Sequence, residues 1–596
     1  MFSRSLANKH GCTIPLCQRV LFSTSPSRSA YKDTIPNLKI GAHTRVIFQG
    51  FTGRQATANA QESLAWGTQI VGGVTPGRDG MHPVLQELPV LPTVRAAMDQ
   101  LKPDATGIYV AAHQAAAAIE EAIEAEIPLI VAVAEHIPVH DIMRVRFTPC
   151  SNLSLNPAFP LPTFAAGHVG IVAKSGTLSY ETVASLTRAG LGQSLCIGMG
   201  GDIIAGTDFV DALTVFEHDA DTHGIIIVGE VGGHAEEEAA EWIKEYRKRT
   251  SRPKPIAALV AGKLAKPGHV MGHSGAWAGR GENSAEQKYR ILQDAGAVMV
   301  DHPAQFGQVM NELLISSTKA RNPPPSAQRP NGRRSYHTAH RPRPTSPFPQ
   351  QQRGLHFQSS QASDLILQHG ISITRDATSE EESKACLVSV TIDRSGRGPC
   401  FLTCKPAPGG RNTSPIQAPE EYIKFPFDFR EGPTPELLAQ VLEHLPIDPT
   451  TSRTLTDART LLLALHEIFT QYEGIAVEAK LAIAADTSAL LVYAPRLTFD
   501  DAAFKSCGRH AALHAQRDVS PAAVDPSALA AEADGIVYVR LGPQDPADPE
   551  YTTYDIGTLV NGAGLAMNTV DALVLPRTAR ARRTSSTRAG RRPPRP

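Results

Sequence analysis

Two long blocks of the sequence alternate short apolar stretches with helical stretches, and this alternation constrains the fold more than any other feature. In residues 44–134 the apolar stretches are TRVIFQG, QIVGGV, GIYVAA and PLIVAVA. From about 168 to 314 they are HVGIVAKSG, SLCIGMG, GIIIVGEVGG, PIAALVAG and AVMVD. Helices are expected to begin near Thr177, Asp208, Ala235, Ala285 and Gln305. Strands that alternate with helices in this way predict parallel, doubly wound α/β sheets.

Glycine-containing segments follow several of these strands. Open α/β sheets bind ligands at the carboxyl ends of their strands, so we expect these segments to meet at one site. Ser175, Gly176 and Thr177 lie at a predicted helix start, where free N–H groups and hydroxyls suit a phosphate. Glu230 ends a predicted strand, and His273 lies between small residues in MGHSGAWAGR. Alone, His273 would fit a structural or surface role; together with the other segments it becomes a candidate phosphoryl acceptor.

The turn after the first strand is a weaker signal. Thr52, Gly53, Arg54 and Gln55 stand at the start of a predicted helix, whose N-terminus favours an anion or a pyrophosphate. The segment lacks the complete G-x-G-x-x-G spacing, and a purely structural tight turn explains it equally well.

Length and composition limit the possible functions. A chain of 596 residues should divide into several domains, and a formal net charge of −1 gives no reason to expect a nucleic acid partner. No apolar run is long enough to span a bilayer, so we expect no membrane association. The eight cysteines are scattered, and Cys400 and Cys404 lack a second pair or a nearby histidine, so no metal site is predicted.

Three segments have the composition of unfolded chain. Residues 1–32 contain no acidic residue, and their basic residues alternate with leucine, phenylalanine and serine, which is typical of a mitochondrial transit peptide; a disordered cytosolic tail is the alternative. Residues 319–356 are rich in proline and arginine and predict a linker, although RRSYHTAHRPRP also resembles a second transit peptide. Residues 576–596 form a basic tail. The transit peptide predicts localisation in the mitochondrial matrix.

From about residue 36 to 314 the chain resembles the alpha chain of succinyl-CoA ligase. The motifs that carry the resemblance occur in the family's order: GFTGRQ, GGVTPGRDG, AIEAEIPLIV, KSGTLSYE, GLGQSLCIGMGGD, GEVGGHAEEEAAEW and MGHSGAWAG. The resemblance implies a Rossmann-like CoA-binding domain over 33–160 and a flavodoxin-like ligase domain over 161–318.

The resemblance also assigns roles to residues. His273 matches the histidine that is transiently phosphorylated, and Glu230 matches the acid that holds its ring. Tyr180 matches a residue at the site of the acid substrate. The matches to CoA contacts are Thr52, Gly53, Arg54, Gln55, Arg78 (at the family's lysine position), Val133, Ala134 and Glu135.

The implied reaction suits these residue types. Acyl exchange between CoA and phosphate gives an acyl phosphate, from which a neutral imidazole can take the phosphoryl group. Glu230 would fix the tautomer of the ring and stabilise its positive charge, and the helix start at Ser175–Thr177 would stabilise the phosphate. The expected substrates are succinate or succinyl-CoA, CoA, and ATP or GTP.

The resemblance is interrupted after MRVRF at 143. The family carries a glycine-proline-asparagine-cysteine-proline-glycine loop that leads into a strand, whereas this chain reads TPCSNLSLNPAFPLPTFAAGH. This proline-rich piece, residues 147–164, predicts a loop rather than a strand.

Residues 357–550 resemble the ATP-grasp beta chain of the same ligase, and 551–575 resemble the start of its second CoA-ligase domain. VNGAGLAMNTVDAL is the clearest match, and it places Asn561 at a substrate-site position. Lys480 and Ala494 stand where the family has the Asn and Asp ligands of magnesium, and an ammonium is incompatible with holding a hard dication. We therefore expect a degenerate, incomplete α+β domain, with Mg²⁺ and nucleotide held by a separate, complete beta chain in a heterodimer.

Two functions remain compatible with these residues. The first is a mitochondrial succinate-CoA ligase alpha chain of the tricarboxylic acid cycle that works with a beta chain. The second is a catalytically impaired scaffold that retains the CoA fold. A citrate-cleaving CoA ligase is a related enzyme alternative, although extra citrate-binding domains are not evident in the sequence.

Overall fold

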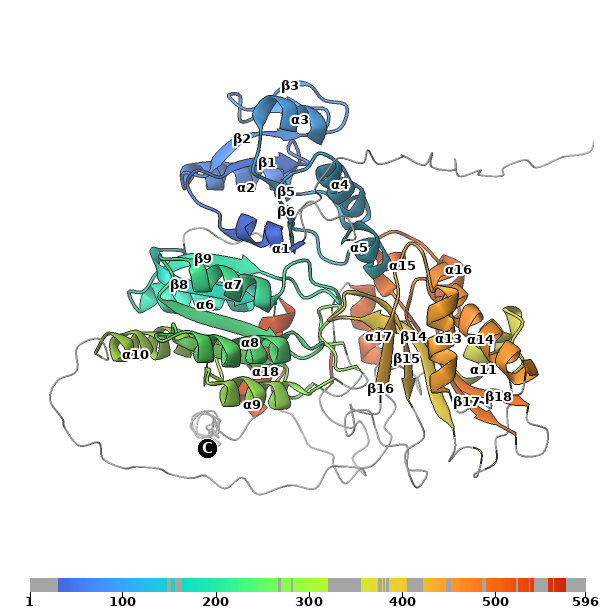
Figure 1. Ribbon diagram of the computed structural model, residues 1–596. Helices are drawn as coiled ribbons and strands as arrows, with labels where there is room; N and C mark the ends of the chain where they lie inside the picture. Colours follow the sequence, from blue (N-terminus) through green and yellow to red (C-terminus); the bar gives the residue numbers. More distant parts are fainter. Residues whose placement is uncertain are drawn as a thin grey trace, which may run out of the picture.

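The computed structural model shows three α/β or α+β bodies (Figure 1). It describes residues 31–146, 152–155, 163–265, 270–279, 282–319, 355–373, 385–404, 422–445, 452–484, 489–520, 524–534, 538–540, 556–560 and 562–574, with Thr378, Glu381, Ile447 and Ile536.

The first body is built on a sheet with the strand order β3-β4-β2-β1-β5-β6-β7. Its strands are β1 Arg45–Gln49, β2 Gln69–Val74, β3 Gly80–Met81, β4 Pro89–Leu91, β5 Ala105–Ile108, β6 Leu129–Ala132 and β7 Asn152–Leu155. Its helices are α1 Tyr31–Thr34, η1 Ile35–Leu38, α2 Arg54–Ala65, α3 Val94–Leu101, α4 Ala112–Glu124 and α5 Val139–Arg146. Apart from the antiparallel edge strand β3, the strands pair in parallel, as the sequence predicted.

The second body is a sheet with the order β12-β11-β10-β8-β9, all in parallel. Its strands are β8 Ala166–Ala173, β9 Gln193–Gly198, β10 Gly224–Glu230, β11 Ile256–Ala261 and β12 Val298–Met299. Its helices are α6 Gly176–Arg188, α7 Phe209–His218, α8 Ala235–Arg249, α9 Ala285–Ala295, η3 Pro303–Gln305 and α10 Phe306–Lys319. Strands β10 and β11 are buried along their whole length, which explains why they are continuous apolar runs.

Capping residues begin α7 and α9 close to the predicted helix starts. Asp208 caps α7 and exchanges hydrogen bonds with Asp211, and Ser284 does the same with Gln287 at the start of α9. Gly296 ends α9 with a φ of 103°, a left-handed conformation that glycine adopts without strain. The alternation of strands and helices was therefore predicted correctly in both blocks.

The third body has an antiparallel sheet with the order β13-β18-β17-β14-β15-β16, the α+β architecture expected of an ATP-grasp-like domain. Its strands are β13 Leu355–Gln358, β14 Cys386–Asp393, β15 Gly398–Cys404, β16 Tyr422–Pro426, β17 Gly474–Ile483 and β18 Leu490–Phe499. The helices of the third body are α11 Ser359–Gln368, α13 Pro435–His444, α14 Ser452–Gln471, α15 Asp501–Lys505, α16 Ala511–His514 and α17 Pro526–Ala533.

The structure corrects three expectations. Residues 152–155 form β7 rather than a loop, because the edge of β6 offers backbone partners to this extended segment. Strand β13 begins at Leu355, inside the predicted linker, because it pairs with β18. Tyr31 and Lys32, assigned to the transit peptide, belong to α1, and Tyr31 donates a hydrogen bond to Asp211 Oδ2 over 2.7 Å.

The last helix, α18 Ala563–Val574, lies away from the third body and packs against α6 and β11 of the second (Figure 1). Asp571 Oδ2 accepts hydrogen bonds from the backbone N–H groups of Gly262 at 2.8 Å and Lys263 at 3.0 Å, and its Oδ1 accepts one from Leu264 at 3.0 Å. Asn568 donates a hydrogen bond to the carbonyl oxygen of Asp301. Residues some 300 positions apart thus form one interface.

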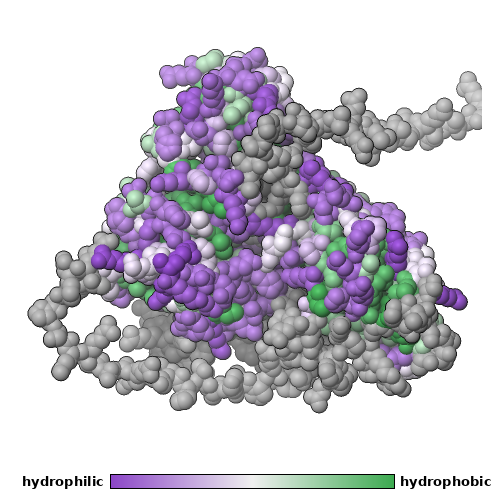
Figure 2. Space-filling view, viewed as in Figure 1, coloured by the Kyte–Doolittle hydropathy of each residue, from purple (hydrophilic) through white to green (hydrophobic). Residues whose placement is uncertain are grey.

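The face in Figure 2 is largely hydrophilic, with apolar colour gathered over the third body. Exposed apolar side chains there include Leu463 on α14 and Leu367 on α11. In the part of the chain that the structure describes, no helix combines the length and apolar character that a membrane span requires.

Candidate active site

The carboxyl ends of the second body's strands position the candidate residues. Glu230 is the last residue of β10, and Ser175 follows β8 and caps α6, where its Oγ accepts a hydrogen bond from the N–H of Leu178. The loop Val270–Gly279, here called the histidine loop, comes after β11 and carries His273. Because neighbouring parallel strands end at the same edge, three segments that are distant in sequence meet there.

His273 and Glu230 form a direct pair. His273 Nδ1 lies 2.9 Å from Glu230 Oε2 and 3.1 Å from Oε1. The carboxylate is almost fully buried, with 2% of its side chain exposed, against 13% for the imidazole. The carboxylate therefore holds Nδ1, and Nε2 has no hydrogen-bond partner among the described residues. This geometry fixes the ring and leaves one nitrogen available for chemistry.

The charges around the ring raise the pKa of His273. Burial alone lowers this pKa, but attraction to the Glu230 carboxylate and the hydrogen bond with it outweigh burial, and Glu135 and Asp202 act in the same direction. The resulting pKa is about 9, so the ring is mostly protonated at neutral pH. Burial raises the pKa of Asp202 to about 7, and the nearby His273 opposes that rise.

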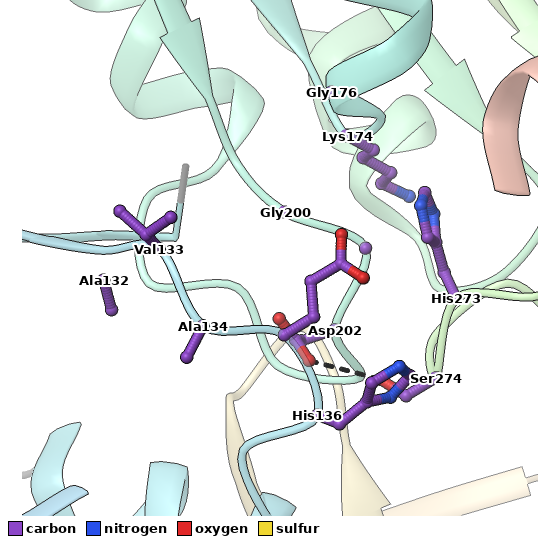
Figure 3. A pocket seen from close by; sticks show the side chains of 12 residues that line it. Ala132, Val133, Ala134, His136, Lys174, Gly176, Gly200, Asp202, His273 and Ser274 are labelled. Atoms are coloured by element: carbon purple, nitrogen blue, oxygen red, sulfur yellow. Dashed lines mark hydrogen bonds between the residues drawn. The ribbon is translucent and has the colours of Figure 1, made fainter. Parts of the chain in front are cut away.

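His273 opens into a hollow of roughly 430 Å³, including the part open to solvent, between the first and second bodies (Figure 3). Asp202 accepts a hydrogen bond from Ser274 over 3.3 Å on one side of it. The lining residues are Ala132, Val133, Ala134, Glu135, His136, Lys174, Gly176, Gly200, Gly201, Asp202, His273 and Ser274. The structure therefore brings the predicted CoA-contact segment Val133–Glu135 together with the predicted phosphoryl acceptor and the start of α6.

A buried network of charged side chains holds the backbone of Glu230 in place. The N–H of Glu230 donates a hydrogen bond to Glu236 Oε1 over 3.0 Å, and Glu236 pairs with Lys174 at 2.9 Å and Lys288 at 2.5 Å. Burial raises the pKa of Glu236, but the ammonium groups of Lys174 and Lys288 have the stronger, opposite effect. The resulting pKa is about 2. Because Lys288 and Glu236 are both fully buried, this network fixes the end of β10.

The remaining predicted CoA contacts lie at the carboxyl edge of the first sheet. Gly53 caps α2, Arg54 and Gln55 form its exposed first turn, and Arg78 is exposed in the turn after β2. The N–H of Thr52 donates a hydrogen bond to Thr75, which joins the two turns. Free N–H groups at a helix start beside two exposed guanidinium groups fit a phosphate-bearing ligand such as CoA.

Other predicted residues lie apart from the hollow or outside the described residues. Thr177 is partly buried, 3.2 Å from Ser175 between the two hydroxyl oxygens, and Tyr180 lies a turn further along α6, outside the lining. Asn561 lies outside the described residues. Lys480 on β17 pairs with Tyr493 on β18, next to Ala494, so a lysine stands where the resemblance places a metal ligand.

Helix α18 reaches the phosphate-binding candidates from the C-terminal end of the chain. A Cβ at Gly564 would lie 2.1 Å from Ser175 Oγ, and one at Gly562 would lie 2.2 Å from Thr177 Cγ2. Glycines at these two positions thus allow the N-terminus of α18 to approach the N-terminus of α6 closely.

Comparison with known proteins decides the family. A sequence model of the CoA-ligase family matches residues 172–298, and one of the CoA binding domain matches 42–136. The succinate–CoA ligase [ADP-forming] subunit alpha of Staphylococcus epidermidis is 38% identical over 287 residues, which are 46% of this chain and 93% of that protein. The chain belongs to the succinate–CoA ligase alpha-subunit family. The Staphylococcus aureus alpha subunit is also 38% identical, over 289 residues.

The part shared with the succinate–CoA ligase alpha subunits is less than half of this chain, and solved structures resemble a larger share. ATP citrate lyase from Methanothrix soehngenii, in complex with citrate and coenzyme A, has a TM-score of 0.42 and 20% identity over 53% of this chain. Dinucleotide forming acetyl-coenzyme A synthetase 1 from Ca. Korarchaeum cryptofilum has a TM-score of 0.37 and 16% identity over 57% of this chain. The chain spans 57% of the former and 71% of the latter.

Sequence reasoning missed several residues of this candidate site. Lys174 directly precedes the predicted phosphate segment, and Asp202 follows the end of β9, so the rule that ligands bind at strand ends could have found both. Lys288 lies in the middle of α9 and has no such signal in the sequence.

Proposed function

We propose that this CoA ligase uses His273 as a phosphoryl carrier in the interconversion of succinate, CoA and nucleoside triphosphate with succinyl-CoA, nucleoside diphosphate and phosphate. The observation that carries the proposal is the His273–Glu230 pair, at 2.9 Å, in a hollow that Val133–Glu135 and the start of α6 also line. The alpha subunits that it resembles at 38% identity support succinate as the acid.

The chain's own residues account for the phosphoryl step. Nε2 of neutral His273 attacks the phosphorus of an acyl phosphate, an N–P bond forms, and the P–O bond to the acyl group breaks to release a carboxylate. Glu230 stabilises the positive charge that develops on the ring. Lys174 and the N-terminus of α6 lie at the hollow, where they would stabilise the charge of the phosphate.

We assign CoA to the carboxyl edge of the first body. Arg54, Arg78 and the first turn of α2 would hold its phosphates, and Val133–Glu135 would carry its thiol end toward the hollow. ATP or GTP, with Mg²⁺, is assigned to a separate beta subunit, because Lys480 and Ala494 are poor substitutes for oxygen ligands. We place the enzyme in the mitochondrial matrix and in the tricarboxylic acid cycle, on the basis of the composition of residues 1–32 and of the resemblance.

The test is a thioester assay with purified chain, CoA and nucleoside triphosphate, with and without a complete beta subunit. Succinate should give CoA thioester when the beta subunit is present, and His273→Asn should abolish it. Citrate as the preferred acid would favour a citrate-cleaving ligase. No thioester with any acid would favour the scaffold.

A further inference from the structure

The turn between β14 and β15 of the third body reaches the second body through two arginines, and they contact different targets. Arg394 contacts the histidine loop. Arg397 pairs with Asp208 and Asp211 at the start of α7, and its Nη1 donates a hydrogen bond to the carbonyl oxygen of Gly206 over 3.3 Å. The two residues stand three positions apart, so each provides a control for the other.

Arg394 binds the histidine loop through its backbone and through a ring. Nη1 donates hydrogen bonds to the carbonyl oxygens of Gly275 at 3.0 Å and Trp277 at 3.4 Å. The guanidinium carbon lies 4.4 Å from the centroid of the Trp277 ring. Only 9% of the Arg394 side chain is exposed, so these contacts are made away from bulk solvent.

Arg394 also compensates a buried carboxylate that closes the loop. Its Nε lies 3.3 Å from Glu282 Oε1, while Glu282 Oε2 accepts hydrogen bonds from the N–H groups of Gly279 at 2.7 Å and Gly233 at 3.0 Å. Burial raises the pKa of Glu282, and Arg394 is the largest of the groups that lower it. Without Arg394, the Glu282 carboxylate, which accepts the N–H of Gly279 at the end of the histidine loop, would lose its main counter-charge.

The second body holds the opposite side of the same loop. The N–H of Gly275 donates a hydrogen bond to the carbonyl oxygen of Gly201 over 2.8 Å, and Ser274 donates one to Asp202. The two residues that follow His273 are therefore held from the second body, and Gly275 is also held by Arg394 from the third. The position of His273 thus depends on both bodies.

We propose that Arg394 is a positioning residue that holds the histidine loop, so that the third body controls the phosphoryl transfer at His273 from within the same chain. This role rests on the proposed function of His273. It gives the ATP-grasp-like body a task that needs no nucleotide of its own. Arg394 acts through the loop backbone, Trp277 and Glu282, whereas the contacts of Arg397 are with the start of α7 and with Tyr31, away from the histidine loop.

The test compares Arg394→Ala, Arg394→Lys and Arg397→Ala in the full chain. Each is made with Trp66→Phe and Trp242→Phe, so that Trp277, the third of the chain's three tryptophans, is the only indole. The first readout is Trp277 emission and its quenching by acrylamide. The second is the rate at which labelled succinyl phosphate labels His273.

In Arg394→Ala we expect red-shifted Trp277 emission, stronger quenching, and labelling that is slower by about ten- to a hundredfold. Arg394→Lys keeps a charge but lacks the planar fork, so its rate should fall between alanine and wild type. Arg397→Ala should keep the wild-type emission and a labelling rate within about twofold.

Three results would overturn the positioning role: labelling of Arg394→Ala at the wild-type rate, unchanged Trp277 emission in that variant, or an equal loss in Arg397→Ala. If the wild-type chain itself takes no label, the proposed function fails. The emission of Trp277 then still decides whether Arg394 holds the loop.

Discussion

Replacement of Glu230 by glutamine should lower the pKa of His273 and change how phosphorylation depends on pH. Glu230 lies 2.9 Å from Nδ1 and is the strongest influence that raises this pKa, against the burial that lowers it. A glutamine keeps the size and a hydrogen-bonding oxygen but removes the charge. The pKa of His273 should then fall from about 9 toward its ordinary value of 6.5.

The size of the effect follows from these two values. A pKa of about 9 in place of 6.5 corresponds to about 3 kcal/mol of preference for the charged ring. Because the pKa is raised on folding, this stabilisation is fully present below pH 6.5 and is lost as the pH rises through about 9. At pH 7 only about one ring in a hundred is neutral, so labelling of the wild type should rise about tenfold from pH 7 to pH 8.

Two measurements check this prediction: the NMR titration of His273, assigned by comparison with His273→Asn, and the labelling rate between pH 6 and pH 10. In Glu230→Gln the labelling rate should become nearly independent of pH above about 7.5. Glu241→Gln, which removes an exposed carboxylate of α8, is the control and should leave both unchanged. A His273 pKa that stays above about 8 in Glu230→Gln would refute the reasoning.

Three other substitutions test separate parts of the structure. In Gly201→Ala the new Cβ would lie 2.2 Å from the His273 ring, so labelling should fall at least about tenfold while circular dichroism stays unchanged. Lys288→Met removes one of two cations from the buried carboxylate of Glu236 and should lower the free energy of unfolding by about 3–5 kcal/mol in chemical denaturation. That loss should shrink as the pH falls from about 4.5 toward 2. The stabilisation that comes from the lowered pKa of Glu236 is fully present above about pH 4.5 and is lost as the pH falls through about 2. Asp571→Ala removes the acceptor of three backbone N–H groups, so hydrogen exchange at residues 262–264 should accelerate by about ten- to a hundredfold.

Each of these has a clear contrary result. Unimpaired labelling of Gly201→Ala would mean that the ring does not need its present place. Wild-type stability of Lys288→Met would show that Lys174 alone compensates Glu236. Unchanged exchange in Asp571→Ala would show that α18 is held by its apolar contacts. Gly557→Ala is the control for all three substitutions: a Cβ at this position meets open space, so every assay should give the wild-type result.

The alternation of strands and helices could be predicted because the parallel strands are continuous apolar runs and several of the helices between them, such as α6, α7 and α9, begin at capping residues. The strand-end rule predicts from the sequence that His273, Glu230 and Ser175 lie at one edge of the sheet. The 2.9 Å between His273 Nδ1 and Glu230 Oε2 confirms that these two residues meet, and Gly176, next to Ser175, lines the same hollow as His273. The phosphoryl role of His273 stays a prediction.

What the sequence did not reveal depends on contacts between distant segments. Arg394 lies in an ordinary hairpin turn, and only the docking of the third body brings it to Gly275 and Glu282. Strand β7 was predicted as a loop because its flanking prolines argued against a strand, whereas its pairing depends on the free edge of β6. Local pattern cannot supply either fact.

The most direct test of the central claim is to locate the phosphoryl group. Wild-type chain is treated with labelled succinyl phosphate, digested at neutral or basic pH, and sequenced by mass spectrometry. We predict one acid-labile, base-stable phosphoryl group on His273, and no label in His273→Asn. Label on another residue, or equal labelling of the variant, would contradict the account.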